Sequence, residues 1–326
     1  MSWIFQEKGP INHYDKTIHE GTQPIRVLNP MLLFWFQNTH PSFAKDLIEQ
    51  IQKNEMKAEL KIPHDEVPII TATGSYLTPY VDKNKVLEIH ETFLSYVWCV
   101  SYSIYVLFLE TIDYPKVNAE VGYEKYKVTP EEIEKAKEMF NYAKSLIKSF
   151  SVWDKDKMPN PESYLAEKRN YVEQTNLFYT DAVKFILCHE YTHIKKHIDK
   201  IDHTTPHSHF LDMEKEADSD ALALVKMGII PEYNEWSIKG GVVIAMLSMF
   251  YFSEVTTGKK HPSTEDRLTF ILEDLDLPDD DFVWAFACIG LKLWDEQFGL
   301  NFKWEKANIS YKELYYRIVA EIKAKH

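Results

Sequence analysis

Residues 92–109 contain no charged side chain, and this uncharged segment constrains the fold more than any other part of the chain. As a helix, it would approach the length of a membrane span. Serine and tyrosine residues make it more polar than a typical span, and no cluster of Lys or Arg flanks it to set an orientation in a membrane. We therefore interpret it as a buried or groove-lining helix, with membrane contact as the alternative.

The composition is that of a folded, mainly helical chain. Hydrophobic residues make up 45% of its 326 residues, and it has only 10 glycines, so it can bury a sizeable core. Its formal charge of −13 argues against binding to nucleic-acid phosphates and against docking on an anionic membrane surface. We therefore expect a protein or peptide partner, no nucleic acid and no membrane, while the oligomeric state stays open.

The cysteines and the N-terminal residues predict a cytoplasmic location. Cys99, Cys188 and Cys288 are odd in number and form no C-x-x-C pair, so they suggest neither a disulfide framework nor a thiolate zinc site. Residues 1–8 lack the basic region and long apolar run of a secretory signal. Both observations fit a reducing compartment.

The pattern of elements predicts a mainly α (α+β) fold with a small antiparallel β-sheet. Short β-branched runs at 67–71 and 74–77, punctuated by Pro and Gly, predict the sheet. An edge strand of that sheet could hold an extended peptide. Periodicity and caps predict helices at 86–109, 181–200, 211–227, 237–255, 262–273, 281–297 and 311–323.

A charged stretch with two prolines, Pro159 and Pro161, is the best candidate for a boundary between two parts of the chain. It separates an N-terminal lobe, residues 1–155, from a helical core, residues 156–326. We expect the catalytic centre in the helical core and assign substrate binding or regulation to the N-terminal lobe.

The functional signal is the sequence H-E-x-x-H from His189 to His193, on a helix that Thr180 is expected to cap. Four residues advance a helix by about one turn, so both imidazoles project to the same side and can reach one metal ion. Glu190 then lies beside the metal, where a carboxylate can act as general base towards water. The pattern is moderately specific and predicts a zinc metallopeptidase.

A catalytic zinc needs a third protein ligand and an open position for water. His197 lies about 12 Å along the helix from His189, too far for ligands that lie about 2 Å from one zinc. We expect His197 behind the ligands, in packing or at the surface. The next helix offers Glu214 as the third ligand, and Asp218, one turn later, to bind the far nitrogen of a ligating histidine. Glu216, about 160° away from Glu214, is the alternative ligand.

Two plainer interpretations compete with this site. The acidic residues 214–220 could form a solvent-exposed face of a helix, which is the usual place of such a charge run. His203, His207 and His209 could also supply ligands, but nothing fixes their geometry, and we interpret them as residues of a polar loop.

Three motifs in order resemble gluzincin peptidases of the M48 type: H-E-x-x-H, then E-x-x-A-D at residues 214–218, then H-P-S with a downstream Arg at residues 261–267. The resemblance implies a zincin-like core with Glu214 as a zinc ligand. It also implies that His261 and Arg267 lie near the metal and steady the intermediate. Such groups can stabilise a developing oxyanion. The alternative is that His261 starts a helix and Arg267 is a surface cation.

The sequence is more similar still to the soluble phage-exclusion (Lit-type) peptidases, family U49, through residues 175–179 and its tyrosine-rich segment. The resemblance covers the C-terminal half well and the N-terminal half loosely. It implies cleavage of the host translation factor EF-Tu after phage infection.

Two other functions compete with a phage-defence role. One is a metalloprotease that cleaves the repressor of a mobile element. The other is a non-catalytic protein in which zinc staples two helices, and this needs a fourth ligand such as His261, His207 or His209.

Overall fold

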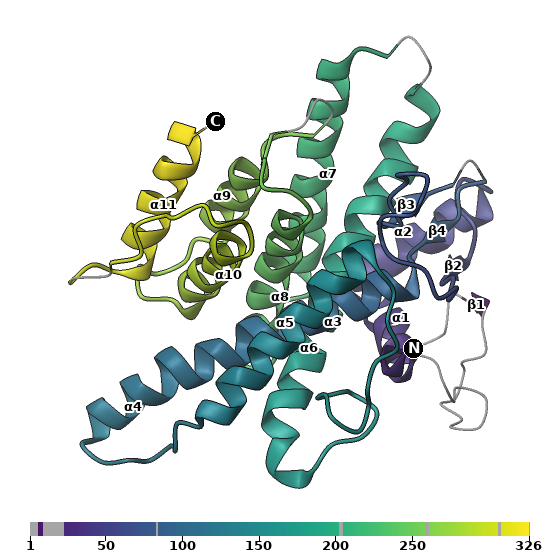
Figure 1. The fold of residues 1–326 in the computed structure, drawn as a ribbon. Helices are drawn as coiled ribbons and strands as arrows, with labels where there is room; N and C mark the ends of the chain where they lie inside the picture. The colour runs from purple at the N-terminus through teal and green to yellow at the C-terminus, as the bar shows by residue number, and fades with distance from the viewer. Residues whose placement is uncertain are drawn as a thin grey trace.

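The computed structural model describes residues 6–8, 23–82, 84–201, 205–257, 261–305 and 308–325, and in these residues helices dominate (Figure 1). The α-helices are α1 (Asn29–Gln37), α2 (Pro41–Gln52), α3 (Glu91–Phe108), α4 (Tyr114–Val121), α5 (Pro130–Lys148), α6 (Arg169–Thr192), α7 (His207–Met227), α8 (Glu235–Ser248), α9 (Thr264–Asp274), α10 (Phe282–Phe298) and α11 (Tyr311–Lys325). The strands are β1 (Gln6–Lys8), β2 (Glu59–Lys61), β3 (Tyr80–Val81) and β4 (Leu87–Glu88). The predicted class, mainly α with a small sheet, is confirmed.

The sheet is mixed, not antiparallel as predicted. Its order is β1-β2-β4-β3, with β2 parallel to both β1 and β4 and only β3 antiparallel to β4. The predicted runs at 67–71 and 74–77 form an isolated bridge, Ile70 to Tyr76, and no strand. The backbone N–H groups of Ile69 and Ile70 donate instead to the carbonyls of Leu146 and Ile147. These are among the last carbonyls of α5, which have no partner within their own helix.

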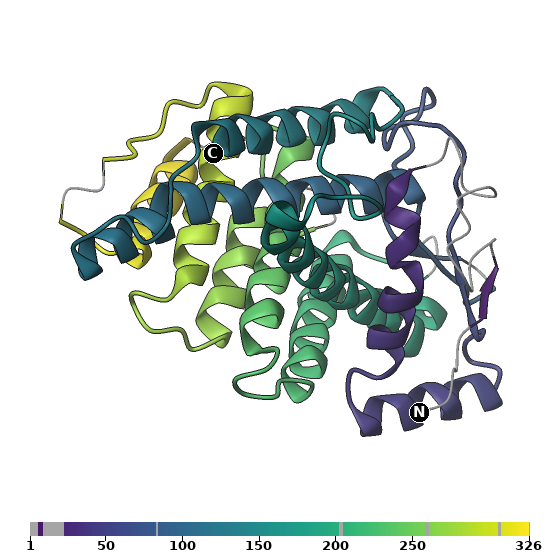
Figure 2. The same ribbon diagram turned by 90° about the horizontal axis from the view of Figure 1, so that it is seen from below.

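The uncharged segment forms α3, and every residue of this helix is buried. It packs against α5, α6, α8 and α10, and Figure 2 shows α3 and α5 side by side across the other helices. A π-helical turn joins α3 to α4, and the continuous helix Glu91–Val121 is long and apolar enough to cross a membrane, although its apolar window lies wholly inside the protein. The helix begins at Glu91 rather than residue 86 because residues 87–88 pair in β4 and His90 caps it.

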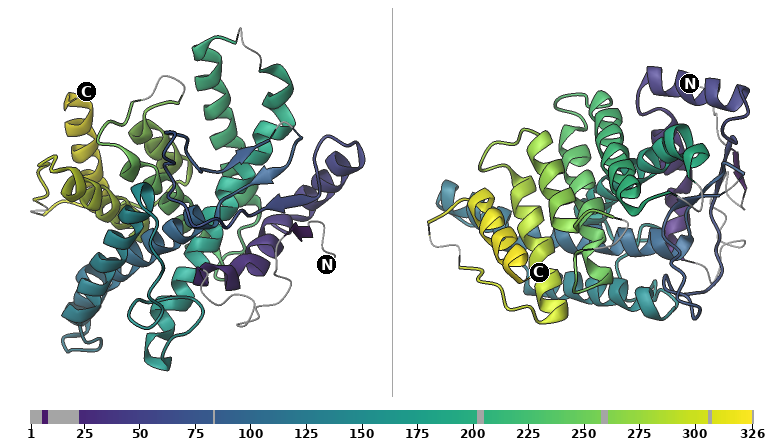
Figure 3. Two further views of the ribbon diagram at one scale, coloured as in Figure 1. Left: turned by 45° about the vertical axis from the view of Figure 1, so that its right-hand side comes forward. Right: turned by 90° about the horizontal axis from the view of Figure 1, so that it is seen from above.

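Helix α6 is longer at its N-terminal end than predicted. It begins at Arg169, so Thr180 lies in its interior and donates its hydroxyl to the carbonyl of Asn176 rather than capping a terminus. After Thr192 the chain continues as a π-helical turn, His193–His197. Helix α7 lies beside α6, and the sheet contacts α6 through β4 (Figure 3).

Two glycines let α8 cross α6 at close range, and this crossing sets where the C-terminal helices meet α6. A Cβ on Gly241 would lie 2.8 Å from the carbonyl oxygen of Phe178 and 2.7 Å from the Cβ of Asp181. A Cβ on Gly240 would lie 2.4 Å from the ring of Phe178. Neither position has room for a side chain.

Replacing Gly241 by Ala should therefore lower the free energy of unfolding. Helix propensity alone would favour Ala by about 1 kcal/mol, whereas overpacking costs about 1–3 kcal/mol or more. Chemical or thermal denaturation of the Gly241→Ala and Gly240→Ala proteins measures the net effect of helix propensity and overpacking on stability. Gly240→Ala should lose less stability, because the ring of Phe178, which it would meet, can shift, whereas the backbone carbonyl of Phe178, which Gly241→Ala would meet, cannot. A Gly241→Ala protein more stable than the original would contradict the close crossing.

Candidate functional site

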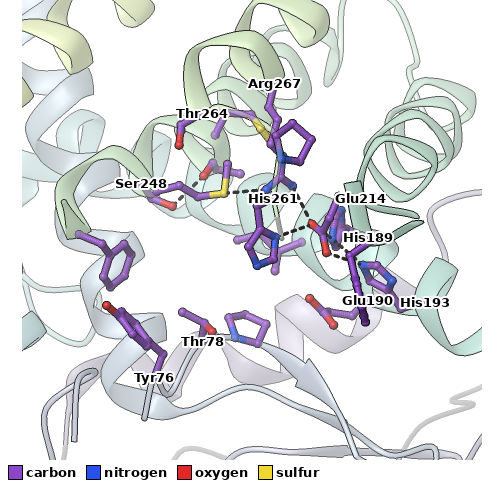
Figure 4. Close-up of a pocket in the computed structure, with 18 of the residues that line it drawn as sticks. Tyr76, Thr78, His189, Glu190, His193, Glu214, Ser248, His261, Thr264 and Arg267 are labelled. Carbon is purple, nitrogen blue, oxygen red and sulfur yellow. Dashed lines mark hydrogen bonds and ion pairs between the residues drawn. The ribbon is translucent and has the colours of Figure 1, made fainter. Parts of the chain in front are cut away.

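Three ligand atoms from α6 and α7 converge at one point. His189 Nε2 lies 3.0 Å from His193 Nε2, and Glu214 places Oε2 3.5 Å from His189 Nε2 and Oε1 3.5 Å from His193 Nε2 (Figure 4). Two ligands that are each about 2.0–2.1 Å from a tetrahedral zinc lie about 3.3 Å apart. The three residues therefore have the spacing of ligands of a single small cation.

The tautomer of His189 is set from behind by Asp218. Nδ1 of His189 lies 2.9 Å from Oδ1 of Asp218, a buried carboxylate that can only accept a hydrogen bond. Nδ1 therefore carries a hydrogen, and Nε2, the other ring nitrogen, points at the convergence point. Arg267 fixes Asp218 in turn, with Nε 2.6 Å from Oδ2 and Nη2 2.7 Å from Oδ1. Such a bidentate contact holds the carboxylate in one orientation.

Two further acidic residues of α7, Glu216 and Asp220, point away from this point. Glu216 contacts His197 and Lys196, and Asp220 also binds Lys196. His197 lies behind His193, with its Nδ1 2.9 Å from Nδ1 of His193. The alternation of the acidic run therefore divides it between two faces of α7, only one of which turns to the ligands.

The electrostatics of the site favour positive charge between the ligands. Burial would raise the pKa of Glu214, but hydrogen bonds from His189, His193 and His261 hold it well below its usual range. Burial would lower the pKa of His189, but the carboxylates of Asp218 and Glu214 outweigh it and raise the pKa to about 9. A divalent cation among the three ligand atoms would satisfy the same field.

Glu190 is the carboxylate beside the ligands. It lies on the cleft wall next to His189 and is partly buried, and this burial raises its pKa to about 7. A carboxylate that changes protonation near neutral pH can both take and return a proton. This is the position and the chemistry expected of a general base.

The ligands lie on one wall of a cleft of about 790 Å³. His261 stands at its mouth, 61% exposed, with Nδ1 3.2 Å from Oε2 of Glu214. The segment before β3 supplies the opposite wall through Tyr76 and Thr78 (Figure 4). Apolar side chains cover much of the rest: Phe93, Phe185, Ile186, Phe210, Met213, Met246, Met249 and Phe252.

Sequence reasoning missed most of this cleft wall. No sequence pattern marks Phe185, Tyr76 or Met249 as facing a cavity. Only the position of Ile186 three residues before His189, on the same face of α6, gave a signal that could have been used.

Of the three other candidate histidines, two lie outside the ligand set and the third lies outside the described residues. His207 and His209 lie in the exposed first turn of α7. His203 lies outside the described residues. In the described part of the chain, the metal-ligating set with atoms within 4.8 Å of one another consists of His189, His193 and Glu214.

Comparison with known proteins identifies the family. The model of the family Peptidase U49 matches residues 87–287, more than half of the chain. The chain belongs to the peptidase U49 family. The matched residues span β4 to the first part of α10 and include both α6 and α7 of this U49 peptidase. The searches of curated proteins and of solved structures gave no match. As a peptidase, the protein is a hydrolase that acts on protein or peptide substrates.

Removing Glu214 should abolish tight zinc binding, because the site loses a ligand and its only negative charge between the imidazoles. Glu214→Ala should weaken zinc affinity by more than about 100-fold, beyond the effect of losing an outer partner alone. Competition with a chromophoric chelator measures this. Glu216→Ala, two residues away on the opposite face, is the matched control and should lose no more than about tenfold. The reverse order of effects would assign the ligand to Glu216.

Proposed function

We propose that this U49 peptidase is a zinc-dependent endopeptidase whose metal is held by His189, His193 and Glu214. The observation that carries the proposal is the convergence of two imidazole nitrogens and a carboxylate at one point, with Glu190 beside them on a cleft wall. Two imidazole nitrogens and a carboxylate that converge in this way can bind one metal ion in place of the hydrogens that they otherwise share.

The donor set fits zinc, which takes imidazole nitrogen and carboxylate oxygen in catalytic sites with three protein ligands. When bound, zinc would supply Lewis-acid chemistry, polarising the scissile carbonyl and lowering the pKa of water. Glu190 takes the proton from the attacking water and returns it to the leaving amine. The apolar walls of the cleft limit the water around the reacting groups.

Arg267 and His261 have different roles in this proposal. Arg267 is bound bidentately by Asp218, and its Nη2 lies 3.7 Å from Oε2 of Glu214, so it orients Asp218 and balances the charge of both carboxylates. His261 is exposed at the mouth of the cleft beside Glu214. From there it can donate to the oxygen on which charge develops when the peptide carbonyl is attacked.

The substrate we propose is an extended segment of another protein. A cleft of about 790 Å³ with walls from several elements suits a stretch of chain, and its aromatic and methionine side chains suit large apolar residues of the substrate. Membership of the U49 family and the resemblance to its phage-exclusion members support a defence protease acting on a translation factor in the cytoplasm.

A role in which zinc only staples two helices has less support. Such a site needs a fourth protein ligand, and the candidates named from the sequence do not complete one. Among the described residues, His207 and His209 are outside the ligand set, and His261 is largely exposed and contacts Glu214. The arrangement therefore favours a position open to water.

Glu190→Gln should keep zinc and lose cleavage, because the amide preserves shape and removes the base. Loss of a general base typically lowers the rate by about 10²–10⁴-fold. Zinc content and single-turnover cleavage of a protein substrate in a cell extract, with both proteins at equal zinc loading, measure the two effects. A Glu190→Gln enzyme that cleaves as fast as the original protein would exclude the mechanism.

The translation-factor substrate has its own test. Purified EF-Tu, incubated with the zinc-loaded enzyme alone and with a phage-infected extract as a source of trigger, should yield two fragments that the Glu190→Gln enzyme does not produce. Mass spectrometry of the new termini locates the cut. An intact factor together with another protein cleaved in the same extract would reject this substrate while leaving the peptidase mechanism in place.

A further inference from the structure

We infer that His197 is a positioning residue that fixes the tautomer and orientation of the zinc ligand His193, through a His193–His197–Glu216 relay. The inference rests on the proposed zinc site. It assigns a function to the third histidine of α6 and its π-turn and to the face of α7 that does not reach the metal. The relay consists of the contact of 2.9 Å between the two Nδ1 atoms and the contact of 3.1 Å from His197 Nε2 to Glu216 Oε2.

The direction of the relay follows from its last member. Glu216 is a carboxylate and can only accept, so Nε2 of His197 carries the hydrogen. In a neutral His197 the other nitrogen, Nδ1, then offers a lone pair. Nδ1 of His193 must donate to it, which leaves the lone pair of His193 Nε2 towards Glu214 and His189. The opposite direction would put a hydrogen on the nitrogen that faces the metal.

The π-helical turn is what places His197 behind His193. In a regular α-helix, residues four apart are offset by about 40° around the axis. The turn His193–His197 is wider, because its hydrogen bonds join residues five apart, and it brings the two side chains closer to one line. The ring centroids of His193 and His197 are 5.0 Å apart, and His197 is only 2% exposed although it is the last residue of the π-helical turn. Single π-turns within α-helices occur frequently at functional sites.

The same turn also fixes Glu216. Nζ of Lys196, one residue before His197, lies 2.7 Å from Oε1 of Glu216 and 2.6 Å from Oδ2 of Asp220. The ammonium group occupies one carboxylate oxygen, and the second oxygen is left for His197. The half-exposed Glu216 is thereby held in the one orientation that the relay requires.

The two histidine ligands therefore have different supports. His189 is backed directly by the buried Asp218, whereas His193 is backed by an imidazole that a carboxylate orients. Outer partners of this kind raise ligand basicity and fix ring orientation, and their loss typically costs about 10- to 100-fold in metal affinity. Loss of His197 would also leave the Nδ1–H of His193 without its acceptor.

The test separates hydrogen bonding from packing at residue 197. His197→Phe keeps a ring and removes the acceptor, whereas His197→Asn removes the ring and can offer an amide oxygen near the position of Nδ1. In the full-length protein, we expect His197→Phe to weaken zinc affinity by about 10- to 100-fold and to change the visible spectrum of the Co²⁺-substituted site. His197→Asn should stay within about threefold. His209→Phe, at an exposed position of α7, should change neither.

Glu216 gives a second arm that does not disturb the core. Glu216→Ala should weaken zinc by about 3- to 10-fold, the value of one partly exposed hydrogen bond, whereas Asp220→Ala removes a contact to the same Lys196 and should leave the affinity unchanged. Zinc affinity unchanged in a folded His197→Phe protein, or unchanged in Glu216→Ala, would overturn the relay. Absence of zinc binding in the original protein would instead reject the proposed function.

Discussion

The pairing of α6 with α7 is the contact on which the rest of the account depends. Helix α6 and its π-turn supply two imidazoles and the neighbouring Glu190, and α7 supplies the carboxylate that completes the proposed ligand set. Each of the two histidines contacts a further group from behind, Asp218 for His189 and His197 for His193. A shift of about 1 Å between the two helices would break the contact of Asp218 with His189 and those of Glu214 with both imidazoles together, because each depends on short distances.

The rest of the molecule holds that pairing in place. Asp46 of α2 accepts from the hydroxyl of Tyr191, which lies between the two histidine ligands in the sequence, and contacts the ammonium group of Lys195. On the other side, Gly241 of α8 allows that helix to lie directly on α6, and α9, which packs on α8, brings Arg267 to Asp218. The buried α3 packs against both α6 and α8. Contacts from separate parts of the chain thus converge on one helix.

The sequence was sufficient to predict the fold class, the approximate helices and the three residues that converge in the candidate metal site. Helical spacing alone brings His189 and His193 to one side and separates Glu214 from Glu216, since these relations are local. The predicted sheet was wrong in type and place because its strands are only two or three residues long. The N–H groups of residues 69 and 70 pair with the end of α5, a long-range choice that no local pattern encodes. The residues of the cleft wall and the π-helical turn were not predicted for the same reason, because no local pattern encodes them. The division of the chain at residue 155, the cytoplasmic location and the roles of His261 and Arg267 stay predictions.

The central claim is that one zinc ion is held by His189 of α6, His193 of the π-turn and Glu214 of α7, with a position left for water. Anomalous diffraction at the zinc edge from crystals of the zinc-loaded Glu190→Gln protein tests it most directly. The account predicts a single peak about 2.0–2.2 Å from Nε2 of His189, Nε2 of His193 and an oxygen of Glu214, with a solvent molecule as the remaining ligand. A peak elsewhere, or one closed by a fourth protein ligand, would contradict it.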